Sequence, residues 1–172
     1  MPAAAQRPPA CAALSPHAAP SPLRTTMPRI TLDLPDTLPF SIELPIYLSQ
    51  INRAGHLDNA LLLTLVSEAR SGFIRSLGFD ESNVDGAGVI VADAAVQYCS
   101  EAFHGETMVV TMGAGDFNKY GCDLQWRMRD RASGREVARG KTGIVFFDYD
   151  ARRITAAPQA FVQAIAALAD AR

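Results

Sequence analysis

Apolar and polar side chains alternate along two short stretches near the start of the chain, at residues 30–34 and 40–48. A period of two is typical of β-strands, because successive side chains point to opposite faces of a sheet. Pro45 has no backbone N–H to donate. The second strand is therefore expected at a sheet edge, or with a bulge at this position.

The second half of the chain carries four longer strand-like stretches, at residues 89–98, 106–117, 121–130 and 136–149. The links between them are short and polar, and each contains glycine: residues 102–105, 118–121 and 131–135. Links of this kind predict antiparallel hairpins between consecutive strands.

Between these two groups of strands, residues 60–77 carry the longest helical pattern of the chain. Their apolar positions cover most of the helix circumference, which predicts a buried helix. Asp58 or Asn59 could cap its first turn, and Gly78 stands where a C-terminal glycine cap is expected. Residues 158–171 predict a second, amphipathic helix at the end of the chain.

A strand, a buried helix and four antiparallel strands together predict an α+β fold. A helix too apolar for a surface needs a sheet that wraps around it, and one face of that sheet needs a helix to cover it. A long curved antiparallel sheet around one central helix satisfies both conditions. This arrangement is the hotdog fold.

The first 29 residues differ from the rest of the chain. They hold seven of its eleven prolines and no acidic residue. We expect a flexible arm at residues 1–29 and a hotdog domain at residues 30–172, because dense proline blocks regular structure. The arm lacks the continuous apolar core of a secretory signal. An organelle-targeting segment, or a natural start at Met27, remain open readings of it.

Composition places the domain among ordinary globular proteins, with 48% hydrophobic and 20% charged residues. A net charge of −2 gives no basic excess for nucleic acid, and no apolar run is long enough to span a membrane. The three cysteines suggest neither a disulfide framework nor a metal site. Cys99 and Cys122 are expected as buried free thiols of a cytoplasmic protein.

Three short motifs resemble those of the hotdog acyl-CoA thioesterases related to 4-hydroxybenzoyl-CoA thioesterase. They are Gly-His-Leu-Asp-Asn at 55–59, Glu-Ala-Arg at 68–70 and Leu-Gly at 77–78, and the likeness extends over roughly residues 40–150. The resemblance implies acyl-CoA substrates and active sites between the subunits of a homodimer or a dimer of dimers. It implies neither a metal nor a covalent cofactor.

One residue departs from the family pattern. In many relatives an aspartate three residues before the glycine of the Gly-His motif is the general base or nucleophile, and Asn52 occupies that position here. A neutral amide can neither accept the proton nor attack the carbonyl. We expect Asn52 to line the site and to hold a water or the thioester by hydrogen bonds.

Three other residues are candidates for activating water: Asp58, Glu68 and His56. Asp58 lies near the helix start, where the helix dipole keeps a carboxylate ionised, but it could simply be the helix cap. Glu68 lies on the polar face of the helix, but it could simply pair with Arg70 or Arg75. His56 could act as acid or base, or could only orient the loop.

The remaining residues of the motif are candidates for binding the substrate. Gly55, Leu57 and Asn59 are expected beside the thioester, although Asn59 could instead satisfy backbone groups of the turn. Backbone amides of residues 55–59, at the start of the helix, are expected to stabilise the oxyanion.

Hydrolysis of an acyl-CoA thioester is therefore the leading functional hypothesis. A hotdog hydratase or dehydratase is an alternative, but the sequence after His56 lacks the motifs of those enzymes. A non-catalytic acyl-CoA-binding protein is a second alternative, which Asn52 favours. The sequence leaves open the acyl group, and whether the carrier is CoA or an acyl carrier protein.

Overall fold

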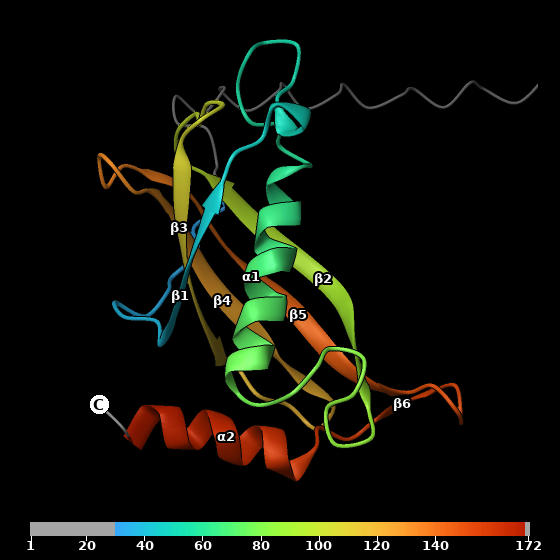
Figure 1. Cartoon of the computed structure of the whole chain (residues 1–172). Coiled ribbons are helices and arrows are strands. Elements are labelled where there is room, and N and C mark those ends of the chain that lie inside the picture. Colours follow the sequence, from blue (N-terminus) through green and yellow to red (C-terminus); the bar gives the residue numbers. More distant parts are fainter. Residues whose placement is uncertain (1–29, 171–172) are drawn as a thin grey trace, which may run out of the picture.

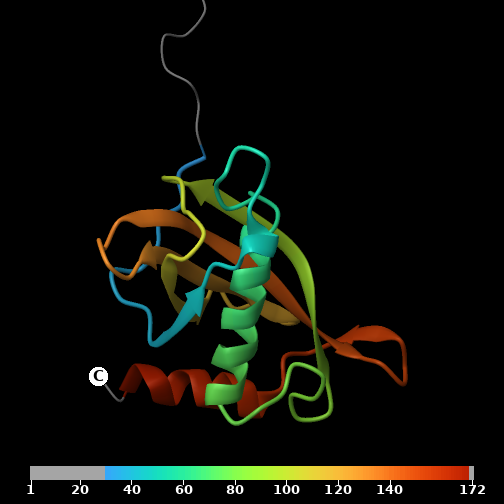
Figure 2. The ribbon, with the colours of Figure 1, turned by 45° about the horizontal axis from the view of Figure 1, so that its top comes forward.

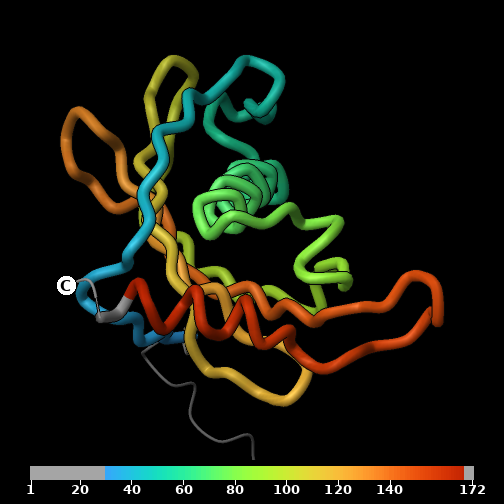
Figure 3. The backbone as a smooth tube through the Cα atoms, turned by 60° about the horizontal axis from the view of Figure 1, so that its bottom comes forward, coloured from blue at the N-terminus to red at the C-terminus, as the bar shows by residue number. Residues whose placement is uncertain are grey.

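An antiparallel sheet curves around one long helix in the computed structural model, which describes residues 30–170 (Figure 1). Its strands are β1 (Phe40–Pro45), β2 (Gly88–Tyr98), β3 (Thr107–Gly115), β4 (Gly121–Asp130), β5 (Glu136–Asp148) and β6 (Arg153–Thr155). Their order across the sheet is β1-β3-β4-β5-β2, and β6 pairs with the end of β5. Viewed nearly along the helix axis, the sheet bends around the helix (Figure 3). The predicted α+β hotdog architecture is confirmed.

The alternating pattern of the strands separates the two faces of the sheet. On β4, Leu124, Trp126 and Met128 are fully buried on the concave face. The residues that alternate with them, Asp123, Gln125 and Arg127, are partly exposed and charged or polar. Asp123 pairs with Lys141 of β5. β1 is an edge strand and ends at Pro45, as its missing N–H predicts.

The central helix α1 (Leu62–Ser76) lies within the predicted range. Its buried residues form one stripe facing the sheet: Leu62, Leu65, Val66, Ala69, Phe73 and Ile74. The opposite side exposes Thr64, Glu68 and Arg75, so the expectation of a helix buried all round is wrong for the single chain. Gly78 has φ +88° and follows the helix, as a C-terminal glycine cap requires.

Helix α2 (Gln159–Asp170) lies across the C-terminal end of α1 in both side views (Figures 1 and 2). Phe161 anchors it and is fully buried. Its ring lies 5.2 Å from that of Phe146 and 6.4 Å from that of Phe79. Neither described helix combines the length and the apolar character that crossing a membrane requires.

Several local expectations are wrong. Residues 30–34 form no strand, since no neighbouring strand pairs with them. The link at 102–105 is not a hairpin, because β2 and β3 are separated in the sheet by β4 and β5. It belongs to a crossover that passes the N-terminal end of α1. Strand β6 is absent from the predicted elements. The predicted arm at residues 1–29 lies outside the described residues.

Candidate active site

A cavity of about 350 Å³ lies beside the N-terminal end of α1. Two segments far apart in sequence form it: the Gly-His segment before α1 and the β2–β3 crossover, joined by a hydrogen bond from the Leu57 amide to the Ala102 carbonyl (2.7 Å). The cavity is lined by His56, Leu57, Asn59, Leu62, Tyr98, Cys99, Ser100, Glu101, Ala102 and Val137. It therefore combines an apolar floor with polar and ionisable side chains.

A tight turn over residues 52–55 sets the position of His56. The Gly55 amide donates to the Asn52 carbonyl (3.0 Å), and the Asn52 amide donates to the His56 carbonyl (2.9 Å). Gly55 has φ +87°, a conformation that side chains other than hydrogen disfavour. Asn52 and Gly55 do not line the cavity but shape the turn that leads into it. Their predicted contact with substrate stays a prediction.

The side chain of Asn52 holds the His56 ring directly. Its Oδ1 accepts a hydrogen bond from the Ala54 amide (2.9 Å), which leaves Nδ2 facing His56 Nδ1 at 3.3 Å. On the other side of the ring, His56 Nε2 lies 3.9 Å from Glu101 Oε1. The ring is 30% exposed and borders the cavity.

Asp58 holds the turn that leads into α1. Its Oδ1 accepts hydrogen bonds from the amides of Ala60 (2.8 Å) and Leu61 (3.2 Å). Both residues precede Leu62, where α1 begins, and the N-cap position is Leu61, so the prediction of Asp58 as the cap itself is wrong by three positions. The carboxylate is thus engaged outside the cavity, which it does not line.

Glu68 lies on the exposed side of α1 and does not line the cavity. Its expected pairing with Arg70 is wrong, because Arg70 pairs with Glu81 at 2.9 Å. No ion pair joins Glu68 to any side chain within residues 30–170.

Leu57 and Asn59 both border the cavity, and their predicted contact with substrate stays a prediction. Leu57 is buried in the floor. Asn59 is exposed, and its carbonyl accepts a hydrogen bond from the Tyr98 hydroxyl (2.8 Å). Its side chain makes no hydrogen bond to the described backbone of the turn, so that interpretation is wrong.

Most of the amides predicted to stabilise an oxyanion already have partners. Those of Gly55, Leu57 and Asp58 donate to carbonyls of Asn52, Ala102 and Gln50. Within the described part of the chain, the amides of residues 56 and 59 donate to no protein acceptor. Both residues border the cavity, so these two N–H groups are the remaining candidate donors.

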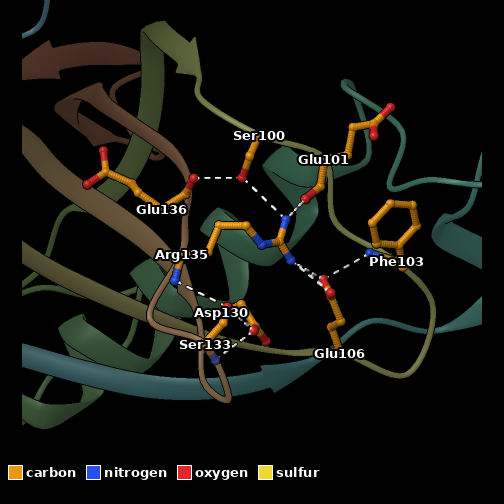
Figure 4. Close-up of polar contacts among 8 residues, drawn as sticks. All are labelled: Ser100, Glu101, Phe103, Glu106, Asp130, Ser133, Arg135 and Glu136. Atoms are coloured by element: carbon orange, nitrogen blue, oxygen red, sulfur yellow. Dashed lines mark hydrogen bonds and ion pairs between the residues drawn. The ribbon is translucent and has the colours of Figure 1, made fainter.

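An ion-pair network that sequence reasoning missed holds the opposite wall (Figure 4). The Arg135 guanidinium donates to both carboxylate oxygens of Glu106 (2.8 and 2.9 Å), to Ser100 Oγ (3.3 Å) and to the Glu101 carbonyl. Ser100 Oγ in turn donates to the Glu136 carbonyl (2.7 Å). The network fixes the backbone of the crossover. An arginine in a hairpin gives no local signal for such a role, because its partners are about 30 residues away.

The two cysteines of the described region occupy different surroundings. Cys122 is buried, as expected, and burial raises the pKa of its thiol to about 12. Cys99 is exposed in the cavity wall, so the expectation of a buried thiol is wrong for it. Partial desolvation, followed by the nearby Glu136 carboxylate, raises its pKa as well. Neither thiol is thus activated as a nucleophile.

Comparison with known families decides the class of this chain. The thioesterase-like superfamily matches residues 47–165, which include both walls of the cavity and α1. The chain belongs to this superfamily. Thioester hydrolysis is the activity that membership supports, and the cavity beside the Gly-His segment is its candidate site. No curated protein sequence matches the chain.

Solved structures of the superfamily's fold agree with this assignment. A 1,4-dihydroxy-2-naphthoyl-CoA thioesterase from Synechocystis superposes with a TM-score of 0.67 at 20% identity, covering 74% of this chain and 95% of its own. A DHNA-CoA thioesterase from Staphylococcus aureus gives 0.68 at 16% identity, covering 77% and 94%. A further Staphylococcus aureus protein, solved in complex with CoA, gives 0.69 at 18% identity, covering 81% and 89%. These likenesses establish the fold.

Proposed function

We propose that the protein hydrolyses an acyl-CoA thioester to the free acid and CoA in the cavity beside α1. The observation that carries the proposal is that His56 and Asn59, whose amides donate to no acceptor among the described residues, both border one cavity. The superfamily match supports thioester hydrolysis. A relative of the same fold solved with CoA supports CoA as the carrier.

The reaction adds water to the thioester carbonyl carbon and then breaks the C–S bond. The negative charge that develops on the carbonyl oxygen is stabilised by N–H groups aimed at it, here those of residues 56 and 59 at the positive end of α1. Water gives up one proton during the attack, and the CoA thiolate takes one up on leaving. His56 lies where it can serve in these proton transfers.

We further propose a homodimer formed through the edge of β2. This strand pairs with β5 on one side, and no described strand pairs with its other edge. Its residues 91–94 are exposed, and an unpaired edge favours association. A small cavity between α1 and β2, lined in part by Leu63, Ser67 and Val91, would be covered by the partner. The exposed face of α1, with Glu68, would then lie at the interface.

This arrangement keeps Glu68 as a second candidate for the base, acting on the site of the partner subunit. Asp58 is the weaker candidate, because its carboxylate already accepts two backbone hydrogen bonds. A non-catalytic acyl-CoA-binding protein is the alternative function, favoured by the engagement of Asn52 in the turn.

The test is release of free thiol from acetyl-CoA, benzoyl-CoA and palmitoyl-CoA, for the wild type and for H56Q, D58N, E68Q and N52D. We expect turnover by the wild type, within the common range of about 1 to 10³ per second, on at least one substrate. H56Q should lower kcat. A wild type that releases no thiol, beside N52D that does, would show that the chain binds acyl thioesters without hydrolysing them.

Light scattering on the eluting protein tests the dimer. The wild type should elute at twice the mass of the chain or at a multiple of it, and V91D should shift it toward the monomer. A wild-type monomer at micromolar concentration would exclude a site shared between subunits.

A further inference from the structure

A carboxylate faces the cavity from the wall opposite the Gly-His segment. Glu101 lies in the β2–β3 crossover, 45 positions after His56 in the chain, and lines the same cavity. Its Oε1 lies 3.9 Å from His56 Nε2. The side chain is 67% exposed, and Figure 4 shows its carboxylate pointing away from the Arg135 network. It is therefore free to contact a bound molecule.

Two groups contact Nδ1 of His56, the ring nitrogen that does not face this carboxylate: Asn52 Nδ2 and the Leu57 carbonyl, each at 3.3 Å. The Ala54 amide fixes Asn52 Oδ1 as an acceptor, so Nδ2 is the atom that faces the ring and it can only donate. In the tautomer whose Nδ1 accepts from Asn52, the ring hydrogen is on Nε2, toward Glu101. In the tautomer whose Nδ1 donates to the Leu57 carbonyl, Nε2 carries no hydrogen. Asn52 favours the first, whereas an aspartate at position 52 would favour the second.

In the tautomer that Asn52 favours, His56 donates into the cavity and does not accept there. The acceptor for a water proton must come from another group. Glu101 is the carboxylate closest to this donor, and a water that receives a hydrogen bond from Nε2–H can donate to Glu101 across the 3.9 Å gap.

The backbone that carries Glu101 is held by more hydrogen bonds than an ordinary loop. The Glu101 carbonyl and Ser100 Oγ both accept from Arg135, and the amide of Phe103 donates to Glu106 at 3.0 Å. Arg135 is itself held by the same Glu106 carboxylate. Positioning of this kind is what a catalytic side chain requires of its supporting structure.

We infer that Glu101 is the general base of this enzyme, replacing the carboxylate that Asn52 lacks. Glu101 takes one proton from the water that His56 Nε2–H orients, while the water oxygen attacks the thioester carbon. The tetrahedral intermediate then expels the CoA thiolate, and protonated Glu101 returns its proton to that sulfur. Water and thioester are consumed, and acid and thiol are formed, without any further reactant. The inference rests on the proposed thioesterase activity.

The experiment compares E101Q with the wild type in the thiol-release assay, as a function of pH. Glutamine keeps the shape of the side chain but cannot accept the proton, so kcat should fall about 10²- to 10⁴-fold with little change in KM. The acidic limb of the wild-type pH profile should disappear in E101Q. E101D should recover part of the rate. E43Q, which changes an exposed carboxylate of β1 that does not line the cavity, is the matched control and should equal the wild type.

Each outcome bears on a separate statement. If the wild type hydrolyses a thioester and E101Q keeps kcat within about threefold with its acidic limb intact, Glu101 is not the base and the proposed function stands. In that case a collapse of kcat in E68Q would assign the base to the exposed face of α1. If the wild type hydrolyses none of the three substrates, the proposed function fails, and the role of Glu101 fails with it.

Discussion

At its C-terminal end α1 meets aromatic side chains, whereas at its N-terminal end it meets a polar loop and a cavity. Phe146 and Phe161 are fully buried at the first end, where α2 covers the sheet. At the second end Arg135 and Glu106 hold a crossover open beside His56. Apolar packing fills space, while directional hydrogen bonds can keep a wall in place without filling the space next to it. The comparison therefore separates a stabilising end of the fold from a functional one.

The largest effect is expected from Phe161→Ala at the closed end. Removing a fully buried ring leaves a cavity, which costs about 3–5 kcal/mol of the free energy of unfolding. For a chain of this size the melting temperature should fall by roughly 6–20 °C. Thermal unfolding followed by circular dichroism measures it. kcat at 20 °C should stay within twofold of the wild type.

Phe117→Ala is the matched control, because this ring is 42% exposed. Its loss should change the free energy of unfolding by less than about 1 kcal/mol. Equal melting temperatures for the two variants would mean that α2 does not close the fold at this end.

Arg135→Ala should reduce activity more than stability, the reverse of Phe161→Ala. Its guanidinium is partly buried with Glu106, so the variant should lose about 1–3 kcal/mol of stability, less than Phe161→Ala. We expect kcat/KM to fall at least tenfold, because the backbone that carries Glu101 loses its hydrogen bonds from Arg135. A lysine ammonium cannot place one nitrogen on the Glu106 carboxylate and a second on Ser100 and the Glu101 carbonyl, as Nη2 and Nη1 of Arg135 do, so Arg135→Lys should recover little. Urea unfolding and thiol release measure the two effects.

The control for this variant is Arg131→Ala, which removes an exposed ion pair with Glu43 (2.8 Å). Pairs of this kind contribute less than about 1 kcal/mol. If both arginine variants reduced kcat/KM by the same factor, Arg135 would have no specific role in activity at the cavity end of α1.

Gly55→Ala tests whether the turn before His56 matters for function beyond its own strain. Gly55 and Gly86 both have positive φ, +87° and +88°, and a Cβ would meet no atom within 4 Å at either position. Each alanine should therefore cost a similar free energy of unfolding, about 1–2 kcal/mol, from backbone conformation alone. Only Gly55→Ala should lower kcat, since it moves the His56 ring. Similar kcat values in the two variants would contradict this role of the turn.

How far the sequence predicts this molecule depends on the range of the interactions concerned. The strand at 121–130 and the helix within 60–77 follow from the periodicity of their own side chains, and the structure confirms both. Residues 30–34 carry the same alternation but form no strand, because a strand also needs a free neighbour. The link that ends at Gly105 is a crossover, although its sequence predicts a hairpin. A short polar link with glycine is compatible with either connection, and only the order of the strands in the sheet distinguishes them.

The candidate site divides in the same way. His56, Leu57 and Asn59 could be predicted, because one contiguous motif brings them to the helix start. Glu101 and Arg135 could not, because their place at the cavity depends on the order of strands across the sheet. The only sequence feature that points to Glu101 is its acidic side chain in the link after β2. That feature becomes informative only once the link is known to pass the N-terminal end of α1.

The reactivities of Cys99 and Cys122 provide the test with the smallest expected effect. Each thiol lies in a different region, so its rate of modification describes that region without a mutation. Cys99 lies in the cavity wall, whereas Cys122 is 1% exposed in the core. Thiolate is the reactive form, so a raised pKa slows both thiols at pH 7.5. Iodoacetamide should modify Cys99 more slowly than free cysteine and leave Cys122 intact. Peptide mapping by mass spectrometry follows each cysteine separately.

Raising the pH should accelerate the reaction of Cys99, because its thiolate fraction grows as the pH approaches the raised pKa. Cys122 should react only after unfolding in urea, since burial both raises its pKa and blocks access. A bound acyl-CoA that occupies the cavity should slow Cys99 and leave Cys122 unchanged. If saturating acyl-CoA left the rate of Cys99 modification unaltered, the ligand would have to bind elsewhere. The cavity at the N-terminal end of α1 would then not be the active site.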